Sequence, residues 1–287
     1  MDITCKVEGI DELNLQFVLS AVFTDSQNVR KMSRFWVMRD GIKSSNLSAD
    51  TNGNYRLLWD AKADLGEVRY TNMVVRVSIN GRQKVQLWEN GPYWANMNIG
   101  AEKHEDYGYY FWWGDTVGYK RENNTWVASD GSNSNFLFKE GNVPTYGKSN
   151  SVLQSEGWIT ADGVLAPERD AAKKHWGGDW RMPTKQEFED LNSKCDWIWT
   201  TQNGVEGYVV KGIGEYASNS IFLPCAGGGD GTSLNYASSG GYYWSSVPYS
   251  VSGYYAWGFY FDSGYHGTGN IGRFFGRSIR PLQGFSK

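Results

Sequence analysis

The chain has 287 residues, with 28 Lys and Arg against 31 Asp and Glu and a net charge of −3. This balance argues against a nucleic-acid partner, because clustered positive charge is what binds a polyanion. Aromatic residues make up 16% of the chain, which excludes a disordered polymer, and no apolar run is long enough to predict a membrane span. The chain contains 35 glycines in 287 residues, which is more than the usual share of about 7%. We therefore expect many tight turns held by large side chains, a composition typical of a binding module.

Residues 1–85 are predicted to form short strands. Val75, Val77 and Ile79 alternate with polar residues, and Asn80-Gly81 after them is a tight-turn signal. Residues 35–38 and 55–59 are further strand candidates at the spacing of an all-β domain. The pattern favours a small antiparallel sandwich.

From residue 86 to the end the sequence is dense in Trp, Gly and Asn, and it contains two helix signals. The first covers about Pro167 to His175, with Pro at its start, acidic residues in its first turn and Lys in its last. The second follows Thr184 and Glu187, which have capping-box spacing, and Phe188 and Leu191 form its apolar face. Only strands and loops are predicted after it, so this region is predicted to be an α+β domain.

The cysteines and the N-terminal residues give information on the cellular location of the protein. Cys195 and Cys225 could form a disulfide if the fold brings them together, although a lone Cys is more often a small buried hydrophobic residue. The segment from Met1 to Thr4 lacks the basic and apolar parts of a secretory signal. Export then needs a removed leader or another route, and we expect an extracellular, cell-surface or virion-associated protein.

Six sequence blocks in the second region follow the order of a known family. They are residues 94–101 (WANMNIGA), 107–114 (YGYYFWWG), 176–184 (WGGDWRMPT), 221–224 (IFLP), 243–246 (YWSS) and 276–281 (GRSIRP). They resemble the bacterial major paralogous domain family of the Fibrobacter type. The resemblance implies a C-type-lectin-like fold for residues 86–287, which the variable proteins of diversity-generating retroelements also use, with their hypervariable segment at the C-terminal end. A weaker match for residues 1–85 implies an immunoglobulin-like module.

Four residue types are missing from the 67 residues between Tyr216 and Leu282. The chain has 15 Lys, 14 Glu, 8 Gln and 6 Met, so about 10 of them would be expected there, and none occurs. None of the four is encoded by a codon that ends in a pyrimidine. Retroelements of the class named above randomise adenines in codons of the form A-A-pyrimidine, which never produces these four types or Trp. The absence and the resemblance together predict a hypervariable segment at about residues 227–275.

A second interpretation stays open. An ordinary member of the paralogous family, with a neutral surface rich in aromatic residues and Ser, would also be depleted in Lys and Glu. The depletion of Gln and Met is less easily explained in that way.

The same reasoning sorts residues into scaffold and display. Trp244 and Trp257 cannot arise from such mutagenesis, so we expect them to be scaffold, and we expect Tyr242 and Tyr243 to fill the core. Alternation along the strand predicted at residues 256–262 places Phe259 and Phe261 on the face of Trp257, which we expect to pack.

Residues of the opposite face and of the flanking loops are the candidates for ligand binding. They are Tyr236, Tyr249, Ser250, Ser252, Tyr254, Tyr255, Gly258, Tyr260, Asp262, Tyr265, His266, Asn270, Ile271, Phe274 and Phe275. A surface of this composition has the physics of an antibody paratope, because Tyr offers rigid contact area and Ser and Asn adapt their hydrogen bonds. We expect a monomer that binds a protein or glycan ligand on a cell surface, with no nucleic acid and no membrane span.

Signals for metal binding and catalysis are absent from the sequence. A calcium-dependent lectin needs an E-P-N or Q-P-D triplet with W-N-D, neither of which occurs, and only Asp230 and Asp262 are acidic in residues 227–275. Formylglycine-generating enzymes, which share the implied fold, need a pair of late cysteines, and none follows Cys225. We therefore expect no metal, no cofactor and no enzyme activity. The alternative function is a metal-independent lectin, or a surface structural protein of a paralogous family, with a fixed ligand.

Overall fold

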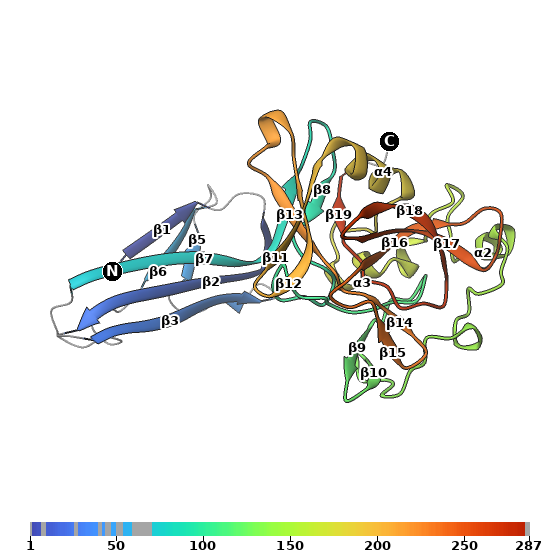
Figure 1. Cartoon of the computed structure of the whole chain (residues 1–287), viewed down its shortest axis with the longest axis horizontal. Coiled ribbons are helices and arrows are strands. Elements are labelled where there is room, and N and C mark those ends of the chain that lie inside the picture. The colour runs from blue at the N-terminus through green and yellow to red at the C-terminus, as the bar shows by residue number, and fades with distance from the viewer. Residues whose placement is uncertain are drawn as a thin grey trace. The chain divides into compact units, whose positions relative to one another are not determined.

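The computed structural model describes residues 83–284 in full and, between residues 2 and 82, the backbone of the strands alone. The chain divides into two compact units, Met1–Gln83 and Lys84–Lys287 (Figure 1). This boundary lies two residues before the one expected from composition.

The N-terminal unit contains two antiparallel sheets. The first has the order β1-β6-β5 and the second the order β7-β2-β3-β4. Their strands are β1 (Asp2–Lys6), β2 (Ile10–Asp25), β3 (Asn28–Arg39), β4 (Ile42–Lys43), β5 (Leu47–Ala49), β6 (Asn54–Leu58) and β7 (Thr71–Gln86). The turn expected at Asn80-Gly81 is wrong, because β7 runs through both residues and stays paired with β2, where Gly81 faces Leu15 beside an irregularity in register.

The C-terminal unit consists of short antiparallel strands in several small sheets. Two hairpins (β9-β10 and β14-β15) accompany two three-stranded sheets (β11-β12-β13 and β16-β17-β18). Strand β8 pairs with β19 and with residues 84–86 of β7, which belong to this unit. The strands are β8 (Tyr93–Ala95), β9 (Tyr119–Glu122), β10 (Thr125–Ala128), β11 (Asp196–Gln202), β12 (Val205–Lys211), β13 (Ser220–Pro224), β14 (Gly228–Asp230), β15 (Ser233–Asn235), β16 (Gly241–Pro248), β17 (Tyr255–Asp262), β18 (Tyr265–Gly272) and β19 (Leu282–Gln283).

The helices of this unit are short. They are α2 (Asn150–Ser155), α3 (Ala171–Trp176) and α4 (Lys185–Lys194), with 3-10 turns η1 (Glu140–Asn142), η2 (Pro167–Arg169) and η3 (Gly214–Tyr216). The capping box of α4 is confirmed, since the Thr184 hydroxyl accepts from the Glu187 N–H and the Glu187 carboxylate accepts from the Thr184 N–H. None of the helices in the described part of the chain has the length and apolar character needed to cross a bilayer.

The helix expected from Pro167 to His175 is two elements rather than one. Asp170, which the charge pattern placed inside the first turn, has extended backbone and is the N-cap of α3. Its carboxylate accepts hydrogen bonds from the N–H groups of Ala172 and Lys173, at 2.8 and 3.1 Å. The turn η2 therefore ends where α3 begins.

The expected α+β, C-type-lectin-like fold class is wrong. The structure is mainly β, its α-helices have only 6, 6 and 10 residues, and no α-helix follows Lys194 in the chain described to residue 284. The frequent turns explain the difference, because glycines with positive φ end strands after a few residues and leave no broad sheet for helices to cover.

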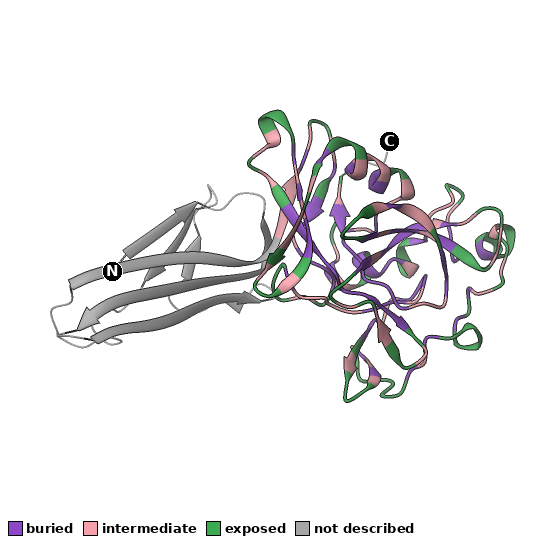
Figure 2. Ribbon diagram, in the orientation of Figure 1, coloured by how far each residue is buried: buried purple, intermediate pink, exposed green. Residues whose placement is uncertain are grey.

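The buried residues of the C-terminal unit are spread over its small sheets and helices (Figure 2), and many of them are large aromatic residues. One cluster contains Trp113, Trp180 and Trp244, which are almost completely buried. A second lies between α4 and the β16-β17-β18 sheet, where the Phe188 and Phe259 rings stack at 5.2 Å. Trp244 is therefore scaffold, as expected.

Both cysteines of this unit are free and buried. Cys195 and Cys225 are not joined in a disulfide. Burial raises the pKa of each thiol to about 12, so both stay protonated at neutral pH.

Buried arginine side chains join distant parts of the chain. Arg280 is fully buried, and its guanidinium donates to the carbonyl oxygens of Ala95 and Phe222 and to the Asn98 side-chain oxygen, at 2.7–3.0 Å. These bonds join the end of the chain to β8, to the loop after it and to β13. A buried guanidinium is tolerated when its N–H groups are satisfied in this way.

Arg280→Met is expected to lower the free energy of unfolding by about 3 kcal/mol or more, because it leaves three buried oxygens without donors. Urea unfolding followed by Trp fluorescence measures the change. Lys120→Met, which removes an exposed ion pair to Glu122, serves as control and should change stability by less than about 0.5 kcal/mol. Equal losses in the two variants would contradict the role given to Arg280.

Candidate functional site

Eight aromatic rings on the C-terminal unit form two runs of four that meet at Arg277, and we call the eight together the aromatic band. Its members are Tyr146, Tyr236, Tyr242, Tyr254, Tyr260, Tyr265, Phe274 and Phe275. All but Tyr146 come from the segment that lacks Lys, Glu, Gln and Met. Three of the rings are well exposed: Tyr236 at 65%, Tyr254 at 51% and Tyr265 at 49%.

Four of these tyrosines follow one another at the β16-β17-β18 sheet. Tyr242 and Tyr260 are cross-strand partners whose rings stack at 6.2 Å. Tyr236 lies 6.0 Å from Tyr242, and Tyr265 lies 5.5 Å from Tyr260. Gly269 makes room for this arrangement, because a Cβ at that position would lie 2.6 Å from the Tyr260 ring.

The other four rings follow the loops beside this sheet. Phe275 contacts Phe274 at 4.1 Å, Phe274 meets Tyr146 edge-on at 5.5 Å, and Tyr146 lies 5.0 Å from Tyr254. Burial and the hydrogen bond that Tyr146 donates to Glu140 raise the pKa of this tyrosine to about 12. Its ring is therefore neutral at physiological pH.

Hydrogen bonds from Arg273 fix the backbone of these loops. Its guanidinium donates to the carbonyl oxygens of Tyr255 at 2.9 Å and of Thr145 and Lys148 at 2.8 Å, and its backbone N–H donates to the Tyr254 carbonyl at 3.0 Å. The backbone that carries Tyr146 and Tyr254 is thus fixed to the strand end that carries Phe274.

The side chain of Arg277 connects the two halves of the band. Its guanidinium carbon lies 4.4 Å from the centre of the Tyr242 ring and 4.7 Å from that of Phe275. Contacts of this kind are attractive, because the face of an aromatic ring is negative.

The turn between β15 and β16 carries backbone strain at the band. Tyr236 has φ 60° and Ser238 has φ 67°, a region that L-residues other than Gly, Asn and Asp seldom occupy. The turn holds this conformation by hydrogen bonds from the N–H groups of Ser239 and Gly240 to the Tyr236 carbonyl. Strain of this kind is concentrated at functional sites in proteins. The Tyr236 side chain on this turn is exposed to solvent.

The residues predicted to bind ligand are placed in three groups. Those exposed are Tyr236, Ser250, Tyr254, Tyr255, Asp262, Tyr265 and Asn270. Those half-buried are Tyr249, Ser252, Tyr260, His266, Phe274 and Phe275. Those buried are Gly258 and Ile271.

The prediction that Gly258 and Ile271 are exposed for ligand binding is therefore wrong. Ile271 is 7% exposed and belongs to the core cluster of Trp244. A Cβ on Gly258 would lie 2.5 Å from Ile271 Cδ1 and 2.7 Å from the Tyr243 carbonyl oxygen. The middle of β17 is covered on both faces, so strict alternation between core and solvent fails there, although Phe259 and Phe261 are buried as expected.

His266 also faces the interior side rather than a ligand. Its ring stacks on Trp197 at 4.6 Å, and its Nδ1 lies 2.5 Å from the Asn192 side-chain oxygen. Burial lowers the pKa of this histidine. It therefore anchors β18 to α4 and the strand after it.

Tyr242 and Tyr243 have different roles: Tyr243 lies in the core and Tyr242 lies in the aromatic band. Tyr243 is fully buried and its hydroxyl donates to the Pro224 carbonyl at 3.0 Å, as expected of a core residue. Tyr242 is half-buried in the band, so the core role expected for it is wrong. Successive residues of a strand point to opposite faces, and this signal could have separated them.

Tyr146 and Arg277 were missed by the reasoning from sequence. Tyr146 lies about eighty residues before the segment predicted to vary, and no local pattern indicates that its loop returns to it. Arg277 stands inside the block at residues 276–281, to which the resemblance assigns no binding role.

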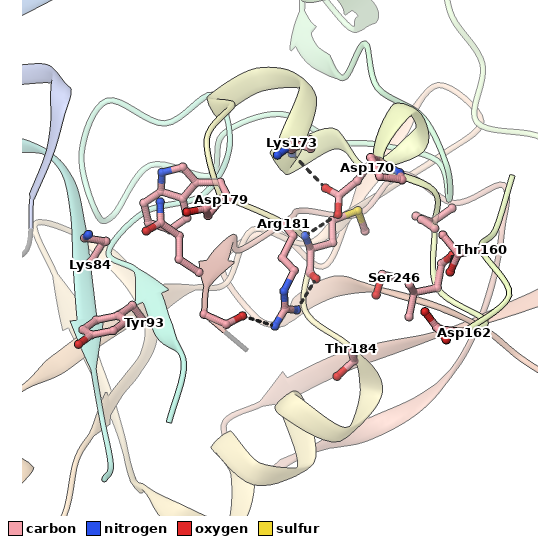
Figure 3. A pocket seen from close by; sticks show the side chains of 17 residues that line it. Lys84, Tyr93, Thr160, Asp162, Asp170, Lys173, Asp179, Arg181, Thr184 and Ser246 are labelled. Carbon is pink, nitrogen blue, oxygen red and sulfur yellow. Dashed lines mark hydrogen bonds between the residues drawn. The ribbon is translucent and has the colours of Figure 1, made fainter. Parts of the chain in front are cut away.

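The C-terminal unit also contains a cavity of about 700 Å³, away from the aromatic band (Figure 3). Two of its charged side chains, the buried Asp170 and the half-buried Arg181, serve the fold. Asp170 accepts from three backbone N–H groups, and Arg181 makes a two-pronged contact with Glu187 at 2.8 and 2.5 Å. Within residues 83–284 no three His, Cys, Asp or Glu side chains gather as a metal site would need. The aromatic band is therefore the better candidate.

Comparison with known proteins adds one finding. Residues 184–282 match a family model described as a domain of unknown function, DUF8237. No curated protein matches the chain, and no solved structure does. The matched region contains the band except for Tyr146.

Replacing Tyr236, Tyr254 and Tyr265 together by Ser is expected to leave the melting temperature almost unchanged, because surface substitutions away from the core alter stability little. Tyr243→Ala in the buried core is the matched contrast and should lower stability by about 3 kcal/mol or more. Differential scanning calorimetry measures both. A large drop in the triple variant would show that the exposed rings hold the fold together.

Proposed function

We propose that this protein is a non-catalytic binding protein that holds a ligand on the aromatic band, and that a retroelement diversifies the segment carrying it. One observation carries the proposal: two runs of tyrosine and phenylalanine rings, partly exposed and joined by Arg277, come almost entirely from the segment that lacks Lys, Glu, Gln and Met. The domain match supports neither catalysis nor binding, because its function is unknown.

The chemistry of the rings suits recognition. Tyr combines a large apolar ring with a hydroxyl and loses few rotamers on binding. Burial raises the pKa of Tyr242 and of Tyr260, so both hydroxyls remain neutral hydrogen-bonding groups. A few such side chains supply most of the affinity of a protein interface, about 2 kcal/mol or more each.

The support under the rings favours a preformed surface. Arg273 fixes the loops of Tyr146 and Tyr254, and β17 and β18 carry Tyr260 and Tyr265 as paired neighbours in the sheet. A ligand would therefore lose little binding energy to loop ordering, which is the usual penalty of a flexible site.

Only some positions of the segment could vary without disturbing the core. Substitutions at Tyr236, Tyr254 and Tyr265 would change the surface and spare the core, since these side chains extend into solvent. Gly258 and Ile271 have no such freedom. The positions that vary should thus be the exposed tyrosines rather than the whole segment.

The source DNA gives the first test. We expect a neighbouring reverse-transcriptase gene and a second copy of the segment that differs only at adenines, with differences at codons for exposed tyrosines and none at Gly258 or Ile271. Sequencing of the locus decides it. Absence of both the gene and the copy would reject diversification and leave a fixed ligand.

Binding itself is tested with labelled full-length protein on a glycan array and on a panel of bacterial cells, each with and without a chelator. The wild type is expected to bind independently of chelator, and Tyr236, Tyr254 and Tyr265 replaced together by Ser should weaken binding by at least about 30-fold. Ser218→Ala and Ser263→Ala together serve as the exposed control. Undiminished binding by the tyrosine variant would reject the band as the binding surface.

A further inference from the structure

Arg277 lies between the two halves of the aromatic band, and its guanidinium has no ion-pair partner among residues 83–284. The residue is 8% exposed, its guanidinium contacts the Tyr242 and Phe275 rings, and its Nε atom is buried without a hydrogen-bond partner. No hydrogen bond or ion pair of its side chain is found among residues 83–284.

Two neighbouring arginines show what the fold does with a structural guanidinium. Arg280 uses all three of its nitrogens in hydrogen bonds to protein oxygens. Arg273 donates from Nε and from Nη1 to three carbonyl oxygens, although its Nη2 has no partner. Arg277, on the same short segment, has no such bonds and only packs against the Tyr242 and Phe275 rings, so hydrogen bonding within the fold does not account for its guanidinium.

The surroundings of Arg277 keep this charge in place. Burial lowers its pKa to about 10, so the guanidinium is still protonated at neutral pH. Asp230 acts on it only through space and makes no ion pair with it. Gly228 leaves the room that the side chain occupies, because a Cβ there would collide with Arg277 Nη1.

A positive charge in an apolar setting attracts an anion strongly, since little water competes for it. The arginine fork matches the two oxygens of a carboxylate. A phosphate dianion would favour a second cation beside the first, and two cations of the neighbouring loops already have partners: Arg273 binds carbonyl oxygens and Lys148 pairs with Glu156. One free guanidinium suits an anion with a single charge.

We propose that Arg277 is the anion-binding centre of the aromatic band and receives a carboxylate of the ligand, with the Tyr242 and Phe275 rings packing against the group that bears it. The proposal rests on the proposed function for its biological meaning, because the band must be the binding surface. The carboxylate can belong to an acidic amino-acid side chain or to an acidic sugar, which share this chemistry.

Titration of the full chain with small carboxylates tests it. The protein is labelled with ¹⁵N-arginine, and the Nε–H signal of Arg277, assigned as the one missing in Arg277→Lys, is followed by NMR. Sodium acetate is expected to shift this signal saturably at concentrations up to about 200 mM, on the scale of a single charge-assisted hydrogen-bond pair. The Arg280 signal should not move, and sodium chloride at equal ionic strength should produce no saturable shift.

Three variants separate the site from a general charge effect, with saturable changes in the Tyr242 ring signals as the common readout. Arg277→Met should fold, because it removes a buried unpaired charge, and should lose acetate binding. Arg277→Lys keeps the charge without the fork and should bind at least about 10-fold more weakly. Gly228→Ala keeps the arginine and displaces it, so it should also weaken binding, whereas Gly264→Ala is the matched control.

Two further probes identify the source of the carboxylate. Tighter binding of N-acetylneuraminic acid than of N-acetylglutamate indicates an acidic sugar, and the reverse order indicates an acidic side chain. An unmoved Arg277 signal in acetate, an equal response to chloride, or unchanged acetate binding in Arg277→Met would each overturn the proposal. Acetate binding that persists while the array shows no ligand would reject the proposed function and keep the anion site.

Discussion

A buried guanidinium needs oxygen acceptors, and most of the C-terminal unit depends on how this protein provides them. Arg280 takes acceptors from Ala95, Asn98 and Phe222, and Arg273 takes them from Thr145, Lys148 and Tyr255. Most of these acceptors lie in loops or at strand ends, and Phe222 lies within β13. Small sheets expose many such groups, so arginines that collect them join segments far apart in the sequence.

The aromatic band is built on this frame. Arg273 fixes the loop backbone beneath Tyr146 and Tyr254, while the β16-β17-β18 sheet, packed on α4 through Phe188 and Phe259, carries the tyrosines of the other half. Arg277 belongs to the same segment and differs from its neighbours in lacking acceptors. A group that the fold leaves unsatisfied is available to a ligand, and we attribute the difference among the three arginines to this division between stability and binding.

Local signals predicted local structure well and topology poorly. The capping box at Thr184 and Glu187 depends on residues within one turn, and it is present. The turn signal at Asn80-Gly81 was overridden, because the long pairing of β7 with β2 outweighs the preference of two residues. The α+β fold class failed for a related reason: counting helices and strands says nothing about how many small sheets the chain forms or which faces they cover.

The sequence by itself determined where most of the candidate binding residues lie, through its excess of Tyr, Ser and Gly and its lack of Lys, Glu, Gln and Met between Tyr216 and Leu282. Only the tertiary structure decided which of them reach solvent. Gly258 and Ile271 are buried because another element covers the second face of β17, and Tyr146 joins the band because its loop returns to Arg273. Exposure and contact depend on neighbours distant in the sequence, which no pattern along the chain records.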